Sequence, residues 1–505
     1  MQLQRSQSQL RNVAARGSRA SQVEARQNHS SAIVAGAGAF VAFVVIITAA
    51  LDQLQSALII MVLLAGLTAL SPRLAIVVTF IYLAIMGDLR RYLVTNAGVT
   101  TNDPMLLVGP VVLVLLLLTA LLKGQISFRS EISKPLLLLV ILMCLEILNP
   151  LQGGVYIGIA GALFFLVPVL WFWVGQAFGS SEFLQKVLKR VVVPIAVAAS
   201  LLGLTQAFFG FLHYEARWFH LMTESSIHPD IRPFSFFCSW GEYPFYVATG
   251  LLVVLVPLFQ GRIRISAVFA PLFILALLIQ SVREPIFESI LALAVLWSVI
   301  GARSRAAMGG RLVVGLLVGG GLLVVAMTQL KEVDAPDEVK AQIDHTTDGV
   351  LEIQNSSAGG HVDMIGAGMV LGITNPIGYG LGYPSVQAAG GYSSEIDFSD
   401  VFVACGVGGG VLNLYIMFIV IRTVIRFWRG QRDPFALYVL AILMLELGHW
   451  TAGGLYAVSP LTWFAIGSLD RAATDALSLQ APVARRAAAP RRLMRSSISV
   501  ASRPA

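Results

Sequence analysis

The chain has 505 residues, of which 56% are hydrophobic and 12% are charged, with a net charge of +7 and a mean hydropathy of +0.77. Soluble proteins carry about 25% charged residues, so this composition excludes a soluble globular protein and indicates an integral membrane protein. Many apolar runs reach the roughly 20 residues that a membrane-spanning helix needs, so we expect the chain to cross a membrane repeatedly.

The first 30 residues are polar and carry five arginines, which favours a disordered cytoplasmic tail over a secretory signal peptide. From residue 31 onward, hydropathy predicts an all-α polytopic fold with about fourteen transmembrane helices, eleven within 31–330 and three within 401–470. The predicted spans are 32–50, 54–71, 74–87, 105–122, 135–149, 155–176, 191–210, 243–259, 265–281, 285–301, 312–330, 401–421, 435–449 and 454–469. The basic, Ala/Pro/Ser-rich segment 471–505 is expected to form a second disordered cytoplasmic tail.

The distribution of basic residues predicts the orientation of these spans. With the N-terminus in the cytoplasm and the spans alternating, 28 of the 35 Lys and Arg residues fall on the cytoplasmic side and 7 on the other. Cytoplasmic loops of membrane proteins carry such an excess of Lys and Arg. We therefore expect both termini in the cytoplasm, and we attribute the net charge to this orientation and to anionic lipids rather than to nucleic acid.

Three outer loops are long, namely 88–104, 211–242 and 331–400. The last is acidic, with eleven Asp and Glu residues against two lysines. Long loops without secondary structure are uncommon and usually functional, so we expect helices over its EVDAPDEVKAQID and HVDMIGAGMVLGI segments. The following NPIGYGLGYP holds two prolines and three glycines and is expected to end the second helix.

The polar chemistry is concentrated on the predicted outer side. No internal repeat is visible, whereas alternating-access transporters are usually built from repeated halves. Ionisable residues inside the spans are few, and Glu146, Glu288 and Glu446 all fall near predicted helix ends. This pattern favours a reaction at the outer leaflet over a conduction path through the membrane.

Arg283 lies in QSVREPIFESILAL, where Pro285 predicts the start of a helix. The free N–H groups and positive dipole end of that helix, with an arginine fork beside them, would suit a phosphate or pyrophosphate. The alternative is an interfacial arginine that reaches water and pairs with Glu284 or Glu288.

Several other outer residues are candidates with a structural alternative. Arg232, in IRPFSFFCSWGEYPF, is either a functional cation or an anchor in an aromatic belt. His361 opens the second loop helix and is either a general base or a surface histidine without a role. Asp400 either complements a helix dipole or binds sugar hydroxyls, and Tyr379 either stacks on a sugar or rests at the interface. The histidines of loop 211–242 match no zinc spacing, so no metal site is expected.

Three motifs occur in a fixed order on the predicted outer side. Arg232 precedes an aromatic-rich stretch, and Arg283 opens the next-but-one span. The third motif is a loop helix followed by a Pro-x-Gly-x-Gly-x-Gly turn, GGHVDMIGAGMVLGITNPIGYGLG over 359–382, with the glycine-rich span GVGGGVLNLYI after it. Over roughly 190–425, these motifs resemble the O-antigen ligase and O-antigen polymerase family of bacterial envelope glycosyltransferases.

The resemblance implies a metal-independent glycosyltransferase without a cofactor. It would transfer an undecaprenyl-pyrophosphate-linked glycan onto another lipid-linked repeat unit at the periplasmic face of the bacterial inner membrane, in O-antigen, capsule or exopolysaccharide synthesis. The expected partners are the lipid-linked oligosaccharide, membrane lipids and a polysaccharide chain-length regulator protein, with no nucleic acid.

The resemblance also implies residue roles. Arg283 and Arg232 would stabilise charge on the leaving pyrophosphate, and His361 would act as the general base. The residues expected to contact the substrate beside them are Arg217, Tyr379 and three carboxylates that are rivals for the role of base, Glu284, Asp363 and Asp400.

Two departures from the family pattern favour a polymerase. His361 stands where the family usually has arginine, and SSEIDFSD replaces the His-Asn pair that ligases tend to carry. A ligase acting on lipid A or protein is the alternative within the family. A lipid-linked oligosaccharide flippase or another transporter is the alternative from a different class, because such flippases also commonly have twelve or fourteen spans.

Overall fold

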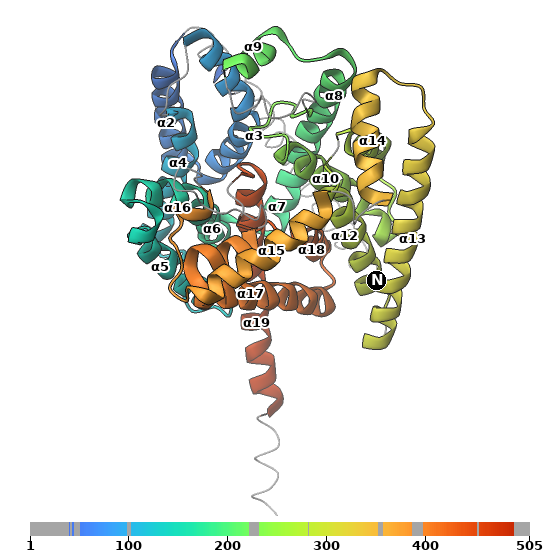
Figure 1. Cartoon of the computed structure of the whole chain (residues 1–505). Coiled ribbons are helices and arrows are strands. Elements are labelled where there is room, and N and C mark those ends of the chain that lie inside the picture. The colour runs from blue at the N-terminus through green and yellow to red at the C-terminus, as the bar shows by residue number, and fades with distance from the viewer. Residues whose placement is uncertain are drawn as a thin grey trace, which may run out of the picture.

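The computed structural model describes residues 40, 43–44, 51–97, 103–221, 232–280, 282–302, 304–351, 357–385, 397–451 and 454–488. Within these ranges the chain is helical and forms no strand (Figure 1). The α-helices are α2 (Gln53–Leu70), α3 (Pro72–Ala97), α4 (Val108–Leu122), α5 (Ser133–Glu146), α6 (Val155–Phe178), α7 (Ser181–Val187), α8 (Val193–Phe209), α9 (His213–Leu221), α10 (Glu242–Leu255), α11 (Ala270–Ile279), α12 (Glu284–Gly301), α13 (Arg305–Lys331), α14 (Asp337–Leu351), α15 (Ser357–Thr374), α16 (Gly382–Ser385), α17 (Asp397–Gln431), α18 (Pro434–Leu445) and α19 (Val458–Ala488). Short 3₁₀ or π-helical segments cover Pro104–Leu107, Pro150–Gln152, Leu188–Val192, Leu258–Gln260 and Ile265–Phe269.

Nine helical segments of the described chain are long and apolar enough to cross a membrane. They are Gln53–Leu70, Pro72–Leu93, Pro104–Leu122, Val155–Phe178, Ser181–Phe209, Glu242–Gln260, Glu284–Gly301, Arg305–Lys331 and Phe398–Gln431. Each overlaps a predicted span, and the shorter helices α5, α11 and α18 occupy three more. The protein is therefore a polytopic helical membrane protein. The predicted tail 1–30 and nearly all of the predicted span 32–50 lie outside the described residues.

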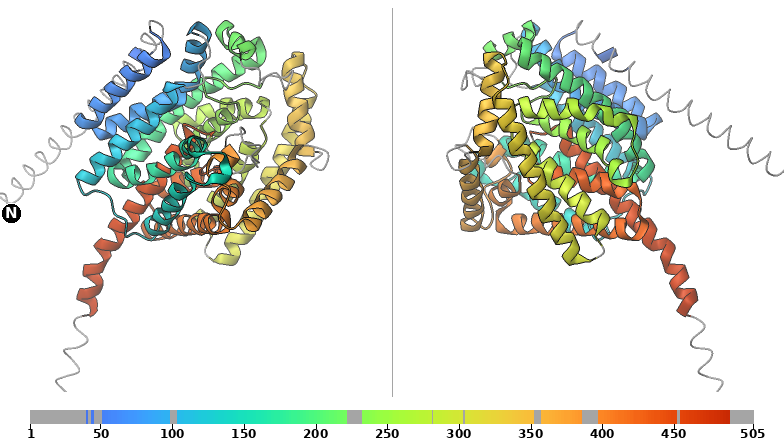
Figure 2. Two further views of the ribbon diagram at one scale, coloured as in Figure 1. Left: turned by 60° about the vertical axis from the view of Figure 1, so that its left-hand side comes forward. Right: turned by 90° about the vertical axis from the view of Figure 1, so that its right-hand side faces the viewer.

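Two helices far apart in the sequence form the centre of the bundle. Helix α19 packs against α6, and residues 458–470 of α19 are all buried. Around this pair, α2 lies against α3 and α4 on one flank, while α13 (yellow) runs along the opposite flank beside α12 and α14 (Figure 2). Only 11% of the most apolar part of α13 is buried, so this helix is peripheral.

Helix α19 also corrects a prediction. It continues to Ala488 and leaves the bundle at the lower edge of Figure 1. The part of the predicted tail from 471 to 488 is therefore helical rather than disordered, because it is rich in alanine, leucine and arginine, which favour helix. Residues 489–505 lie outside the described residues.

The predicted helices of loop 331–400 are confirmed as α14 and α15. The glycine-rich turn after α15 is confirmed as a helix breaker, since Gly378 and Gly380 have φ values of +96° and +95°. The backbone N–H of Gly380 donates to Ala404 in α17 at 3.0 Å. At that point α17 is interrupted by Gly406, whose φ is +64°, so the turn fits into a break in the helix.

Candidate functional site

Four helix ends meet near one end of the bundle, and they bring acidic groups and a histidine together. The N-terminal ends of α10 and α12 meet the C-terminal end of α18 and the start of α19. The groups that meet there are Glu242, Glu284, Glu288, Glu446 and His449. We refer to Glu284, Glu288, Glu446 and His449 as the Glu–His cluster.

Helix α12 begins as the sequence predicts. Its first residue is Glu284, Pro285 follows in the first turn, and Arg283 is the N-cap residue. The carbonyl oxygen of Arg283 accepts hydrogen bonds from the N–H groups of Ile286 and Phe287, at 3.0 and 3.1 Å. The side chain of Arg283 is partly buried, which lowers its pKa from the ordinary value. An arginine nevertheless keeps its charge in a protein, so a cation stands at the positive end of the helix dipole.

His449 and Glu284 form the central contact of the cluster. The Nε2 atom of His449 lies 2.8 Å from Oε1 of Glu284, and the two side chains are 7% and 38% exposed. The ring of Phe245 meets the imidazole edge-on, with the two ring centres 5.0 Å apart. The carboxylate is therefore the accessible member of the pair, and the imidazole lies behind it, inside the bundle.

Glu288 and Glu446 lie deeper. Glu288 is one helical turn after Glu284, on the same face of α12. Its carboxyl group accepts a hydrogen bond from the backbone of Gly448 and interacts electrostatically with Glu284, Glu446 and His449. Its Oε2 atom is buried and accepts no hydrogen bond from the residues that the structure describes. Burying such an acceptor costs free energy, so the position of Glu288 needs an explanation beyond packing.

Two tryptophans hold the segment that carries His449. The indole N–H of Trp450 donates to the carbonyl oxygen of Leu443 at 3.1 Å. The indole N–H of Trp463, on α19, donates to the carbonyl oxygen of Trp450 at 2.6 Å. From the same helix, the hydroxyl of Thr462 donates to Oε2 of Glu446 at 2.6 Å. These bonds tie the end of α18, and the segment that carries His449, to α19.

The aromatic stretch before α10 is held from a different helix. The buried guanidinium of Arg91, on α3, donates to the carbonyl oxygens of Phe237 and Ser235 at 2.6 and 2.9 Å. Burial raises the pKa of the Cys238 thiol to about 12, so this thiol is neutral near pH 7 and is a poor nucleophile. The N–H groups of Cys238 and Ala457 both donate to the buried carboxyl group of Glu242.

Arg232 lies at the start of this stretch and faces α14. Its guanidinium stacks on Trp240, 4.5 Å from the ring centre, and one of its nitrogens is 3.3 Å from Nε2 of His345. Ile343, two residues earlier on α14, packs against Ile279 at the end of α11. Arg232 and the segment that leads to Arg283 thus both contact the same part of α14.

The structure distributes the other predicted site residues over different elements. Arg217 is exposed on α9, and Asp363 is exposed on α15. Asp400 is buried near the start of α17, while Tyr379 stacks on Tyr383, with ring centres 4.8 Å apart. His361 belongs to α15, but its side chain lies outside the described part of the structure. Of the predicted residues, Glu284 belongs to the Glu–His cluster, and Arg283 directly precedes it as the N-cap of α12.

His449 is a residue that sequence reasoning missed. It follows Glu446 by three positions in ELGHW, just after an apolar run. Residues three apart lie on one side of a helical turn, so this Glu-x-x-His spacing was the signal that could have found it. Nothing in the sequence paired it with Glu284, because that contact depends on the packing of α18 against α12.

The Glu–His cluster provides a carboxylate that can accept a proton and a neighbouring arginine that can bind an anion. Within the described ranges, no three His, Cys, Asp or Glu side chains are arranged to hold a metal ion. A scan against protein-family models finds no match to this chain, and a search of the curated proteins finds none either.

Proposed function

We propose that the protein is a membrane glycosyltransferase that uses a polyprenyl-pyrophosphate-linked glycan as donor and another lipid-linked repeat unit as acceptor. The observation that supports this most directly is the neighbourhood of Arg283 and Glu284 at the start of α12. Arg283 and the accessible Glu284 are consecutive residues there, and the buried imidazole of His449 lies 2.8 Å from the Glu284 carboxylate. A reaction of this class needs one group to remove a proton and another to stabilise a departing pyrophosphate.

In the proposed reaction, a hydroxyl oxygen of the acceptor sugar attacks the anomeric carbon of the donor. The new glycosidic C–O bond forms as the bond between that carbon and the pyrophosphate oxygen breaks. The hydroxyl proton passes to Glu284, and the electron pair of the broken bond leaves with the pyrophosphate, whose charge Arg283 stabilises. His449 is a positioning residue that orients Glu284 through its Nε2 atom.

This assignment makes Glu284 the base in place of His361. Glu284 is 38% exposed and is held by a neighbour at 2.8 Å, which are the properties of an accessible and oriented base. The role of Arg232 in stabilising the pyrophosphate is kept, because its segment and that of Arg283 both contact α14.

The proposal includes a membrane topology. It has fourteen spans, both termini in the cytoplasm of a bacterial inner membrane, and the Glu–His cluster at the periplasmic end. The excess of Lys and Arg in the alternate loops supports this orientation. Lipid-linked donors are available on that side, and their pyrophosphate already activates the sugar.

The experiment that tests the function is deletion of the gene in the source bacterium, with analysis of surface glycans and of lipid-linked intermediates. If the protein is a polymerase, the deletion strain carries surface glycans with a single repeat unit. Wild-type protein then restores the long polymer, whereas the Glu284→Gln variant does not. Accumulation of finished lipid-linked polymer would instead indicate a ligase. A glycan profile identical to that of the parent strain would contradict both activities.

A second candidate function is a proton-coupled transporter of lipid-linked glycans. Glu242 and Glu288 favour it, because each has a buried Oε2 atom without a hydrogen-bond partner among the described residues. Ionisable groups inside a membrane bundle often mark proton relays. Purified protein in liposomes distinguishes the two functions. A transferase lengthens the glycan at equal pH on both sides, whereas a coupled transporter moves unaltered lipid-linked glycan in response to a pH gradient.

A further inference from the structure

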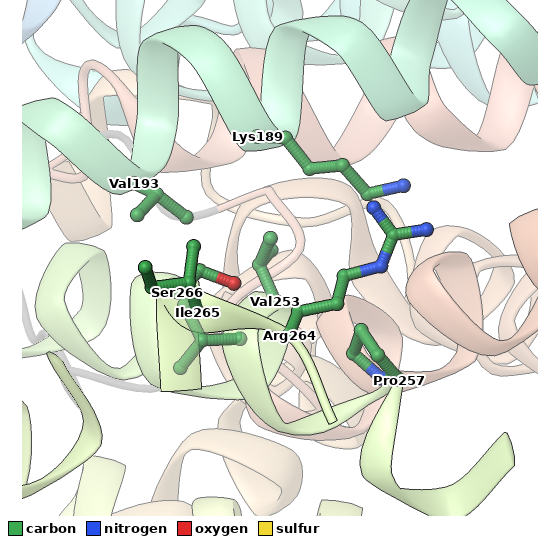
Figure 3. Close-up of a pocket in the computed structure, with 8 residues that line it drawn as sticks. Lys189, Val193, Val253, Pro257, Arg264, Ile265 and Ser266 are labelled. Atoms are coloured by element: carbon green, nitrogen blue, oxygen red, sulfur yellow. The ribbon is translucent and has the colours of Figure 1, made fainter. Parts of the chain in front are cut away.

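A cavity that opens to the surface lies at the other end of α10 from Glu242. It has a volume of about 290 Å³ and lies between the π-helical turn before α8, the end of α10 and the 3₁₀ segment that leads into α11 (Figure 3). A helix rises about 1.5 Å per residue, so α10 separates this cavity from the Glu–His cluster by roughly 20 Å. The lining residues are Lys189, Val193, Val253, Val254, Pro257, Arg264, Ile265 and Ser266.

Two cations converge on this cavity from opposite walls. Figure 3 shows the ammonium group of Lys189 and the guanidinium of Arg264 extended toward each other. Lys189 is held in place by Gln185, whose Oε1 accepts from Nζ at 2.9 Å, and by the ring of Tyr438, 4.8 Å away. In the described part of the chain, the salt bridges involve neither Lys189 nor Arg264, and no acidic residue lines the cavity. Two like charges held close together repel unless an anion lies between them.

The rest of the lining is apolar and continues onto an exposed apolar surface. Val193, Val253, Val254 and Pro257 form the inner walls. Ile265 lines the cavity but is 93% exposed, and the neighbouring Ile263 is 89% exposed. A ligand in this cavity would therefore contact both cations and apolar side chains. A phospholipid has the matching chemistry, because it combines an anionic phosphate with apolar acyl chains.

We propose that this cavity binds the phosphate group of an anionic membrane lipid. Lys189 and Arg264 contact the phosphate oxygens, the Ser266 hydroxyl donates a further hydrogen bond, and the acyl chains lie over Ile263 and Ile265. In the proposed topology this end of α10 faces the cytoplasmic leaflet, whose anionic lipids attract basic segments. The proposal does not depend on the proposed transferase activity, because it concerns the opposite end of the bundle.

The test uses full-length protein in nanodiscs made of phosphatidylcholine alone or with phosphatidylglycerol. We expect phosphatidylglycerol to raise the Tm of the wild-type protein by about 2–4 °C and the double variant Lys189→Gln/Arg264→Gln to lose this rise. The matched control is Arg190→Gln/Arg262→Gln, which removes two exposed cations next to the same residues and should keep the rise. Arg264→Gln alone changes an exposed side chain and provides the comparison if the double variant does not fold.

A further arm identifies the source of the phosphate. Inorganic phosphate added to phosphatidylcholine nanodiscs is expected to raise the Tm much less than phosphatidylglycerol does. If inorganic phosphate alone reproduces the full rise, and Arg264→Gln abolishes it, the phosphate site stands but the lipid assignment is overturned. The site itself is overturned if Arg264→Gln and the double variant respond as the wild type does, or if the control loses the rise equally.

Discussion

The imidazole of His449 and the carboxylate of Glu284 are 2.8 Å apart, with the imidazole buried and the carboxylate partly exposed. In a Ser-His-Asp triad the imidazole faces the substrate and a buried carboxylate orients it. Here the order is reversed, so the carboxylate is the group that a substrate can reach. The neighbouring Arg283 adds a permanent positive charge. This arrangement determines which variants test the roles proposed for Glu284, His449 and Arg283.

Replacing Glu284 with glutamine keeps the size of the side chain and removes its ability to accept a proton. We expect the transfer rate to fall by about 10²–10⁴-fold, which is the usual contribution of a general base. The measurement is glycan extension by purified protein, and the matched control is Asp334→Asn, an exposed carboxylate of the long loop. Normal activity of Glu284→Gln together with loss of activity in His361→Gln would return the role of base to His361.

His449→Gln tests the positioning role. We expect a lower kcat and a nearly unchanged KM, because the imidazole is 7% exposed and lies behind Glu284. We also expect the acid limb of the pH–rate profile to move, since the neighbour of the carboxylate proposed as the base has changed. A variant that folds and whose pH–rate profile matches the wild type, with only a uniform loss of rate, would argue that His449 is structural.

Arg283→Ala removes the cation at the start of α12. We expect a loss of about 10²–10³-fold in kcat, as for other groups that stabilise charge in the transition state. Arg283→Lys should recover only part of the activity, because lysine keeps the charge but lacks the bidentate fork. The control is Lys340→Ala, which removes an exposed cation from α14. Unchanged polymer length and yield in both Arg283→Ala and Arg232→Ala would exclude a pyrophosphate role for these arginines.

Gly378→Ala tests the turn after α15. A Cβ atom at this position would lie 2.4 Å from the carbonyl oxygen of Ala404, and the φ value of +96° is unfavourable for alanine. We expect the free energy of unfolding to fall by about 1–3 kcal/mol, measured as a lower Tm in detergent. Gly366→Ala on α15, where a Cβ meets no atom within 4 Å, is the control and should leave the Tm unchanged or raise it. Equal Tm values for the two variants would contradict a tight turn.

Cysteine labelling tests the proposed topology. Val333 is 50% exposed after α13, and Ile263 is 89% exposed at the other end of the bundle. In a background without the three native cysteines, Val333→Cys should react with an impermeant maleimide that reaches the periplasm. Ile263→Cys should react only after the inner membrane is opened. The opposite labelling pattern would invert the topology and place the Glu–His cluster in the cytoplasm.

Much of the fold follows from local signals in the sequence. Long apolar runs predict the membrane-spanning helices because the hydrocarbon core excludes other structures. Pro285 predicts the start of α12, and the prolines and glycines of NPIGYGLGYP predict the end of α15. These predictions are confirmed because hydropathy and backbone restriction act over a few residues. The sequence predicted a disordered tail from residue 471, whereas α19 continues to Ala488, because the composition of 471–488 fits both a solvated tail and an extended helix.

The turn over residues 376–382 makes long-range contacts that the sequence pattern alone does not predict. The sequence assigned the Pro-x-Gly-x-Gly-x-Gly turn to a functional motif through its resemblance to a family. In the structure, the Gly378 carbonyl accepts a hydrogen bond from Asn149 at 3.0 Å, and the N–H of Gly382 donates to Gln152 at 2.9 Å. The turn thus joins α15 to the segment before α6, and close packing accounts for its glycines.

Composition and local patterns in the sequence are enough to predict a polytopic helical membrane protein, the start of α12 beside Pro285, and the presence of Glu288 and Glu446 near helix ends. The contact between His449 and Glu284, and the shared cavity of Lys189 and Arg264, follow from the packing of the helices. The physical reason is that hydropathy reports the environment of each segment but not its neighbours. The choice of neighbours depends on how side chains of distant helices pack, and here that packing places α18 against α12 and α8 against α10.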